Sequence, residues 1–201
     1  MVGDGMKALH KDFWMEIRKS KARFISIFLI VALGVAFFSG IQASSPDMRY
    51  SGDAYYEAAK LMDLKIQGTL GLTERDVKAV SDIDGVELAE GGYSTDVMSG
   101  EDDARKVLHL ESISSNFNLL TADEGRIPKK SGEIFLDKPF AKNRGYKIGD
   151  TISVREDGDS ELLKKTTYTV VGIGSSPLYI SFNRGNTTLG SGEVSGFGYI
   201  L

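Results

Sequence analysis

A stretch of eighteen residues without a charged side chain, from Phe24 to Ile41, constrains this 201-residue chain more than any other feature. Twelve of these residues are Phe, Ile, Leu or Val, and only Ser26 and Ser39 are polar. A helix at the surface of a soluble protein needs a polar stripe, which two serines cannot provide. At 1.5 Å per residue the stretch is about 27 Å long, close to the hydrocarbon thickness of a bilayer. We therefore predict a transmembrane helix over residues 24–43.

A signal peptide is the main alternative to a membrane span. The region before the apolar stretch is basic, and Ala43-Ser44-Ser45 has the small side chains of a cleavage site. The apolar core of a signal peptide usually has about 7–15 residues, fewer than here. A leader of twenty-three residues is also long for a signal peptide. These lengths favour an uncleaved span.

The charges around the span predict its orientation. Residues 1–23 contain six Lys or Arg and three acidic residues, whereas the whole chain has a net charge of −4. Basic flanks stay in the cytoplasm, so residues 44–201 are expected to be extracytoplasmic. Residues 1–23 also have the pattern of a basic amphipathic helix at the membrane surface. The predicted membrane-interface residues are Trp14, Arg18, Lys19, Lys21 and Arg23.

Small residues repeat along one side of the predicted span. Ala32, Ala36 and Gly40 are each four residues apart. Small side chains at this spacing allow a second helix to approach closely. We therefore predict a helix-packing face at these three residues.

The composition of the outer part excludes some classes of protein. It is acidic, whereas nucleic-acid binding requires a basic face. The chain has no cysteine, so no disulfide framework stabilises it. With 41% hydrophobic residues and four prolines, a globular domain is expected.

The first half of the outer part, residues of about 63–122, predicts a mixture of helices and strands. A helix is expected over 53–63, and a second begins at the cap Thr73, with Asp76 three residues on, and ends at Gly85. Three strands are also predicted in this half, the last of them from the alternation of apolar and polar residues. They cover 64–70, 86–97 and 106–113.

The second half, residues of about 123–201, is expected to be richer in strands. Strands are predicted at 132–137, after Gly149-Asp150, and at 166–173, the last after a hairpin turn at Asp157-Gly158. A short helix should begin at Pro139 and end before Gly145, and the glycine-rich residues 190–198 suggest a loop. The predicted fold class is an α+β domain with a mixed sheet, packed helices and a β-rich second lobe, preceded by one transmembrane helix.

No pattern points to catalysis, a cofactor or a metal. The only two histidines, His10 and His109, fall on opposite sides of the predicted membrane. Asp157, Asp159 and Glu161 lack the glycine and the terminal Glu of an EF-hand. We therefore predict a protein that is not an enzyme.

Two segments of the outer part carry a resemblance to a known family. Residues 125–154, "GRIPKKSGEIFLDKPFAKNRGYKIGDTISV", are followed by "YTVVGIGSSPLYI" at 168–180. This order of motifs after a basic helix and one span resembles the extracytoplasmic domain of FtsX/MacB-like ABC transporter permeases. The residues that carry the match are Gly125, Arg126, Pro128, Gly132, Glu133, Gly149, Asp150 and Tyr168 through Ile173, including Val171 and Gly172.

The resemblance implies a membrane protein that is one part of a larger transporter. A separate cytoplasmic ATPase would hydrolyse ATP, and further permease helices would join this one in the lipid bilayer. Because the family has at least four spans and one is predicted here, the chain is expected to be an N-terminal fragment of a bacterial permease. A single-pass, membrane-anchored binding or adaptor domain is the alternative. An anchored or secreted hydrolase is the third candidate, for which the sequence offers no nucleophile and base.

Overall fold

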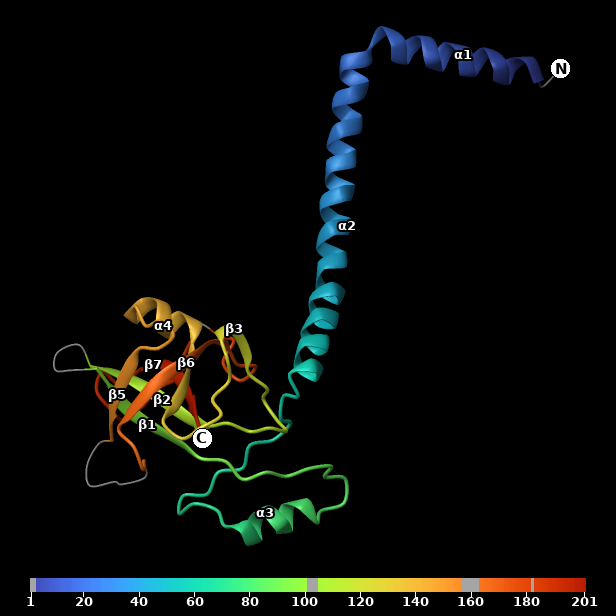
Figure 1. The fold of residues 1–201 in the computed structure, drawn as a ribbon. Coiled ribbons are helices and arrows are strands. Elements are labelled where there is room, and N and C mark those ends of the chain that lie inside the picture. The colour runs from blue at the N-terminus through green and yellow to red at the C-terminus, as the bar shows by residue number, and fades with distance from the viewer. Residues whose placement is uncertain (1–2, 101–104, 157–162, 182) are drawn as a thin grey trace. The chain divides into compact units, whose positions relative to one another are not determined.

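The computed structural model describes residues 3–100, 105–156, 163–181 and 183–201, with side chains from residue 10 onward. The predicted turn at Asp157-Gly158 and the acidic residues Asp159 and Glu161 lie outside the described residues. The elements, shown in Figure 1, are α1 (Gly3–Lys19), α2 (Lys21–Ala58), α3 (Glu74–Ser81), β1 (Ser94–Ser99), β2 (Lys106–Ser112), β3 (Thr121–Gly125), β4 (Glu133–Asp137), α4 (Lys138–Arg144), β5 (Thr151–Arg155), β6 (Thr167–Ser175) and β7 (Val194–Ile200).

The chain divides into two compact units, Met1–Tyr55 and Tyr56–Leu201. The first unit consists of α1 and nearly all of α2. The second contains every described strand, together with α3 and α4. The predicted boundaries at residues 23, 43 and 122 remain predictions, although strands from both sides of residue 122 join one sheet.

In the described part of the second unit, the strands form a mixed sheet that closes on itself. The order is β3-β6-β4-β7-β2-β1-β5, and β5 also pairs with β6. The pairs β2–β7 and β4–β6 are parallel, whereas the others are antiparallel. The first half of β6 therefore closes the ring against β5, and its last residues pair with β3. The mixed α+β fold predicted from the sequence is confirmed, and the closure is a feature that the sequence pattern did not reveal.

The alternation of side chains along the strands separates an inner core from an outer face. In β4, Ile134 and Leu136 join the inner core, whereas Phe135 belongs to a second cluster on the other side of the strand. Helix α4, which directly follows β4, contributes Phe140 to the inner core. Apart from α4, the inner core takes residues from five of the six strands of the ring: Val97, Leu108, Leu110, Ile134, Leu136, Ile152, Val154, Tyr168, Val170 and Ile173.

Strand β7 lies in the region that the sequence suggested to be a loop. Its Gly196 and Gly198 face the inner core, where the Phe140 ring and the Leu110 side chain leave no room for a larger residue. Phe197 and Tyr199 point to the outer face. Gly196 and Gly198 therefore belong to a strand packed against bulky neighbours. The predicted loop is limited to residues 190–193, and the prediction was wrong for 194–198, which lie in β7.

The segment between α2 and β1 also differs from the prediction. Residues 61–93, here called the connecting segment, contain α3 but no strand in this fully described stretch. The strand predicted at 64–70 was wrong, and the strand predicted at 86–97 begins only at Ser94. The predicted cap at Thr73 is confirmed, since the Asp76 carboxylate accepts hydrogen bonds from the Thr73 backbone N–H and hydroxyl. Helix α3 ends at Ser81, earlier than the predicted Gly85.

Helix α2 is longer than the predicted span. It continues from Lys21 to Ala58, with Pro46 inside it, so no separate helix over 53–63 forms. A proline inside a helix removes one backbone hydrogen bond, yet this helix continues through it. The remaining predictions, for β2, β4, α4 and its Gly145 cap, β5 and β6, agree with the structure to within about two residues.

Candidate functional site

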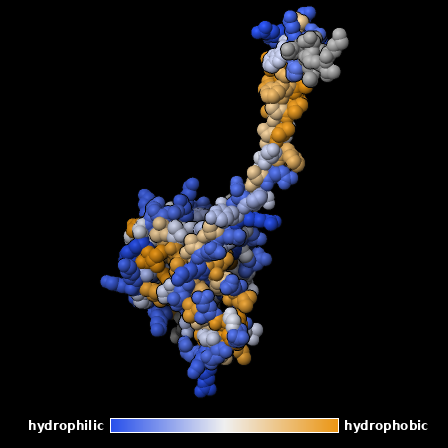
Figure 2. Space-filling model, turned by 90° about the vertical axis from the view of Figure 1, so that its right-hand side faces the viewer, coloured by the Kyte–Doolittle hydropathy of each residue, from blue (hydrophilic) through white to orange (hydrophobic). Residues whose placement is uncertain are grey.

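Helix α2 is the candidate membrane-spanning element. Its 38 residues include an 18-residue window of mean hydropathy 2.6, and none of the residues in that window is buried. A length and composition of this kind are sufficient to cross a membrane. Figure 2 shows the hydrophobic side chains gathered along this helix, between more polar ends.

The predicted membrane-interface residues lie around the junction between α1 and α2. Trp14 is 63% exposed in α1, and Arg18 and Lys19 form the basic last turn of that helix. Lys21 and Arg23 begin α2. Backbone hydrogen bonds from Ser20 to Glu16 and from Phe24 to Ser20 join the two helices through a short bend. An apolar ring beside a cluster of basic residues is typical of a helix end at a membrane surface.

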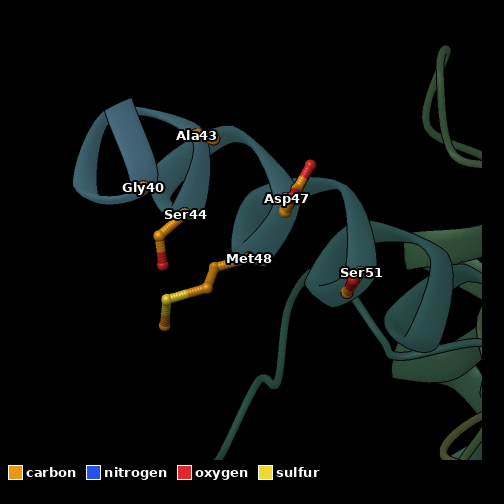
Figure 3. Close-up of a pocket in the computed structure, with 6 residues that line it drawn as sticks. All are labelled: Gly40, Ala43, Ser44, Asp47, Met48 and Ser51. Atoms are coloured by element: carbon orange, nitrogen blue, oxygen red, sulfur yellow. The ribbon is translucent and has the colours of Figure 1, made fainter. Parts of the chain in front are cut away.

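The predicted helix-packing residues continue into a shallow, open hollow on α2. Ala32, Ala36 and Gly40 are four residues apart in one helix and therefore share a face. The hollow begins at Gly40, and Figure 3 shows its lining. The lining residues are Gly40, Ala43, Ser44, Asp47, Met48 and Ser51.

The residues of the family signature form a turn that is closed by an ion pair. Arg126 follows β3, and its guanidinium contacts both carboxylate oxygens of Glu133, at 2.8 Å and 2.5 Å. Glu133 also accepts the backbone N–H of Lys129 at 2.8 Å. The arginine, followed by this backbone donor, lowers the pKa of Glu133 to about 2. The spacing of seven residues between Arg126 and Glu133 thus closes the turn that holds the buried Pro128.

The glycines of the signature allow two backbones to cross. Gly125 lies opposite Gly172 in the β3–β6 pair, and the Arg126 N–H donates to the Val171 carbonyl at 2.9 Å. A side chain at Gly125 would overlap the Val171 carbonyl oxygen, and one at Gly172 would overlap the Arg126 carbonyl oxygen. Gly125 also has a φ of 71°, which residues with a side chain rarely adopt.

The other two glycines of the signature occupy turns. Gly132 and Gly149 have φ values of 94° and 93°. Beside Gly149, the Asp150 carboxylate accepts the Lys147 N–H at 2.8 Å. These contacts give the signature a structural role in the second unit.

A polar and aromatic cluster that the sequence analysis missed lies on the outer face of the sheet. Tyr179 stacks on Phe197 with ring centroids 3.6 Å apart. The guanidinium carbon of Arg184 lies 5.2 Å from the centroid of the Phe197 ring. The Arg184 guanidinium also pairs with Asp137 at 2.5 Å. Burial raises the pKa of Asp137 despite hydrogen bonds from Phe197 and Arg184. No pattern in the sequence pointed to this cluster, because the partners of Asp137 are Arg184 and Phe197, 47 and 60 residues away.

Among the described residues, no three His, Asp or Glu side chains are arranged to hold a metal ion. His10 lies in α1 and His109 lies in β2, so the two histidines belong to different units. The described part of the second unit carries ion pairs at several places, among them Arg126–Glu133 and Arg184–Asp137.

Comparison with known proteins identifies the family. The model of the MacB-like periplasmic core domain family matches residues 24–195, which include the apolar part of α2 and most of the sheet. The chain belongs to this family, and the FtsX/MacB-like permease resemblance found in the sequence is confirmed. No curated protein matches the chain.

Among solved structures, the chain is similar to the extracellular domain of the noncanonic ABC-type transporter YknZ from Gram-positive bacteria. The identity is 14% and the TM-score is 0.42. The match covers 66% of this chain and 64% of the YknZ chain.

Proposed function

We propose that this chain is part of a permease subunit of an ABC transporter, in which α2 crosses the membrane and the second unit lies outside the cytoplasm. The observation that carries the proposal is the family match, because it covers both the apolar helix and the sheet. A separate ATPase subunit supplies the energy from ATP hydrolysis, and other permease helices complete the membrane part. The chain itself couples the two sides of the membrane and performs no chemistry.

The surface of α2 supports a role in helix packing. Residues Ala32, Ala36 and Gly40 allow close approach of another permease helix within the bilayer. The positive charges at Lys19, Lys21 and Arg23 support a cytoplasmic N-terminus, because basic flanks of a span usually stay in the cytoplasm.

The proposed orientation can be tested with single cysteines, because the chain contains none. Ser51→Cys and Ser20→Cys place a thiol after and before the apolar stretch, at two exposed positions. A maleimide that does not cross membranes should label Ser51→Cys in intact cells, and should label Ser20→Cys only after lysis. Labelling of Ser20→Cys in intact cells would refute the orientation.

The proposed partner can be tested by purification from native membranes. An affinity-tagged full chain should copurify with an ATPase that carries a phosphate-binding loop, and the purified sample should hydrolyse ATP. The matched control is a chain with Ala32, Ala36 and Gly40 replaced by Leu, which should lose the other permease helices. Recovery of the tagged chain alone, in its folded form, would favour the anchored binding or adaptor domain.

A further inference from the structure

A histidine on the outer face of the sheet lies between two carboxylates. Register places Asp96 of β1 opposite His109 of β2, and His109 beside Phe197 of β7. The Nδ1 atom of His109 is 2.5 Å from Asp96 Oδ1, and its Nε2 atom is 3.7 Å from Glu111 Oε1. The His109 side chain is 20% exposed, and those of Asp96 and Glu111 are 26% and 9% exposed.

Each ring nitrogen of His109 faces a carboxylate oxygen, so each is best matched by an N–H group. A neutral imidazole carries one N–H and one lone pair, whereas the imidazolium ion carries two N–H groups. Neutral His109 can donate to Asp96, but its other nitrogen then presents a lone pair to the Glu111 carboxylate. Protonated His109 presents a donor to both acids. The geometry of the cluster is therefore complementary to the charged ring.

Glu111 connects this histidine to two segments that are distant in sequence. Its Oε1 atom accepts a hydrogen bond from Lys65 of the connecting segment at 2.8 Å. The same atom accepts a hydrogen bond from the Tyr179 hydroxyl at 2.9 Å. The rings of Tyr179 and Phe197 both lie edge-on to His109, with centroids 6.1 Å away. One carboxylate thus joins β2, the connecting segment and the segment that contains Tyr179.

The charged groups around His109 balance only when it is protonated. Asp96 comes from β1, Glu111 from β2 and Lys65 from the connecting segment. The hydroxyl groups of Tyr179 and Tyr199 are neutral because burial raises their pKa values, and Arg184 pairs with Asp137. With neutral His109, the two carboxylates face one ammonium group, so the cluster keeps an excess negative charge.

We propose that His109 is a proton-dependent clamp, which in its charged form ties Asp96 and Glu111 together and steadies the segments held by Lys65 and Tyr179. A rise in pH of the surrounding medium neutralises His109 and loosens these segments. The proposal concerns the folded second unit alone, and it goes beyond the permease function without depending on the orientation in the membrane.

The pKa values agree with this direction. Burial lowers the pKa of His109, but hydrogen bonds and charges of Glu111 and Asp96 outweigh it and raise the pKa above 6.5. Burial raises the pKa of Glu111, whereas hydrogen bonds from His109 and Lys65 bring it down to about 2. A raised pKa stabilises the fold fully below the unfolded value of 6.5. That stabilisation disappears as the pH rises through the folded value, so the clamp holds below pH 6.5 and is released as the pH rises above it.

The first experiment measures the protonation of His109 directly. The full chain in detergent micelles carries two histidines, so His10→Gln leaves the imidazole of His109 as the only one in the NMR spectrum. Its titration midpoint should lie above 6.5, and Asp96→Asn should lower that midpoint by about one pH unit, because one of the two carboxylates is removed. A midpoint at or below 6.5, or one that Asp96→Asn does not move, would overturn the proposal.

The second experiment tests the link to the fold. The unfolding temperature of the His10→Gln chain should fall between pH 6.5 and 8.5, and the additional substitution His109→Gln should make this fall smaller. Hydrogen exchange, corrected for its intrinsic dependence on pH, should show Lys65 and Tyr179 opening with the same midpoint as His109. An equal fall with and without His109 would show that the histidine titrates without acting as a clamp. If His109→Gln does not fold, the exchange midpoints of the His10→Gln chain still decide the question.

Discussion

Strand β2 and residues 64–70 of the connecting segment have the same kind of sequence and different structures. Both alternate apolar and polar side chains, with Leu108 and Leu110 in β2 and with Leu64 and Ile66 in the connecting segment. Leu108 is fully buried between β1 and β7, whereas Leu64 is 84% exposed. Alternation therefore describes how a strand presents its two faces. A strand forms only where neighbouring strands accept its backbone hydrogen bonds.

The largest difference between the two regions should appear when a leucine is truncated in each. Leu108→Ala should lower the free energy of unfolding by about 2–5 kcal/mol, because it leaves a cavity inside the closed sheet. Leu70→Ala, at a side chain that is 100% exposed, should change it by less than about 0.5 kcal/mol. Chemical denaturation of the full chain in micelles gives both values. Equal losses would mean that Leu70 is packed in solution.

A smaller difference is expected from adding one methyl group to a glycine of the sheet and to a glycine of the connecting segment. Gly172→Ala places a side chain against the Arg126 carbonyl and the Phe135 ring, and should cost about 1–3 kcal/mol. In Gly91→Ala the new methyl group meets only Val77, at 3.4 Å, and should cost less than about 0.5 kcal/mol. Thermal unfolding of the two variants measures the contrast. A neutral Gly172→Ala would show that β3 does not cross β6 as closely as described.

The smallest effect on global stability is expected at the cap of α3. Asp76→Ala removes the acceptor of the Thr73 backbone N–H and hydroxyl, and should destabilise this helix by about 1 kcal/mol. Since α3 has no buried residue among those described, global unfolding should hardly change. Amide exchange should become faster in α3 and stay the same in β2.

The control for this substitution is Glu74→Ala, which removes another acid from the same first turn. It weakens the favourable interaction with the helix dipole and leaves the cap in place. Faster exchange in β2 after Asp76→Ala would indicate that α3 and the sheet unfold together.

Much of the second unit could be predicted because its signals are local. The Gly145 cap, the turn at Gly149, the alternation in β2 and β5 and the short apolar run of β4 depend on a few adjacent residues. The wrong predictions were those in which the outcome depends on distant neighbours. Residues 194–200 form a strand because Phe140 and Leu110 pack against the glycines, and this cannot be read from a glycine-rich stretch.

The candidate sites follow the same division. The ion pair between Arg126 and Glu133 lies within a motif of eight residues, so the resemblance pointed to it. The cluster around His109 brings together residues 65, 96, 111 and 179, which only the folded chain places side by side. A histidine in an alternating strand carried no sign of its two acidic neighbours.

By itself, the sequence determined that this chain has a helix apolar enough to cross a membrane, and that its motifs are those of a MacB-like periplasmic core domain. Both conclusions depend on the composition and order of contiguous residues, which folding does not alter. Only the tertiary structure decided that the sheet closes through β5 and β6, that β7 forms and that His109 lies between two acids. Each of these requires partners far apart in the chain, because strand pairing and buried charge are properties of contacts.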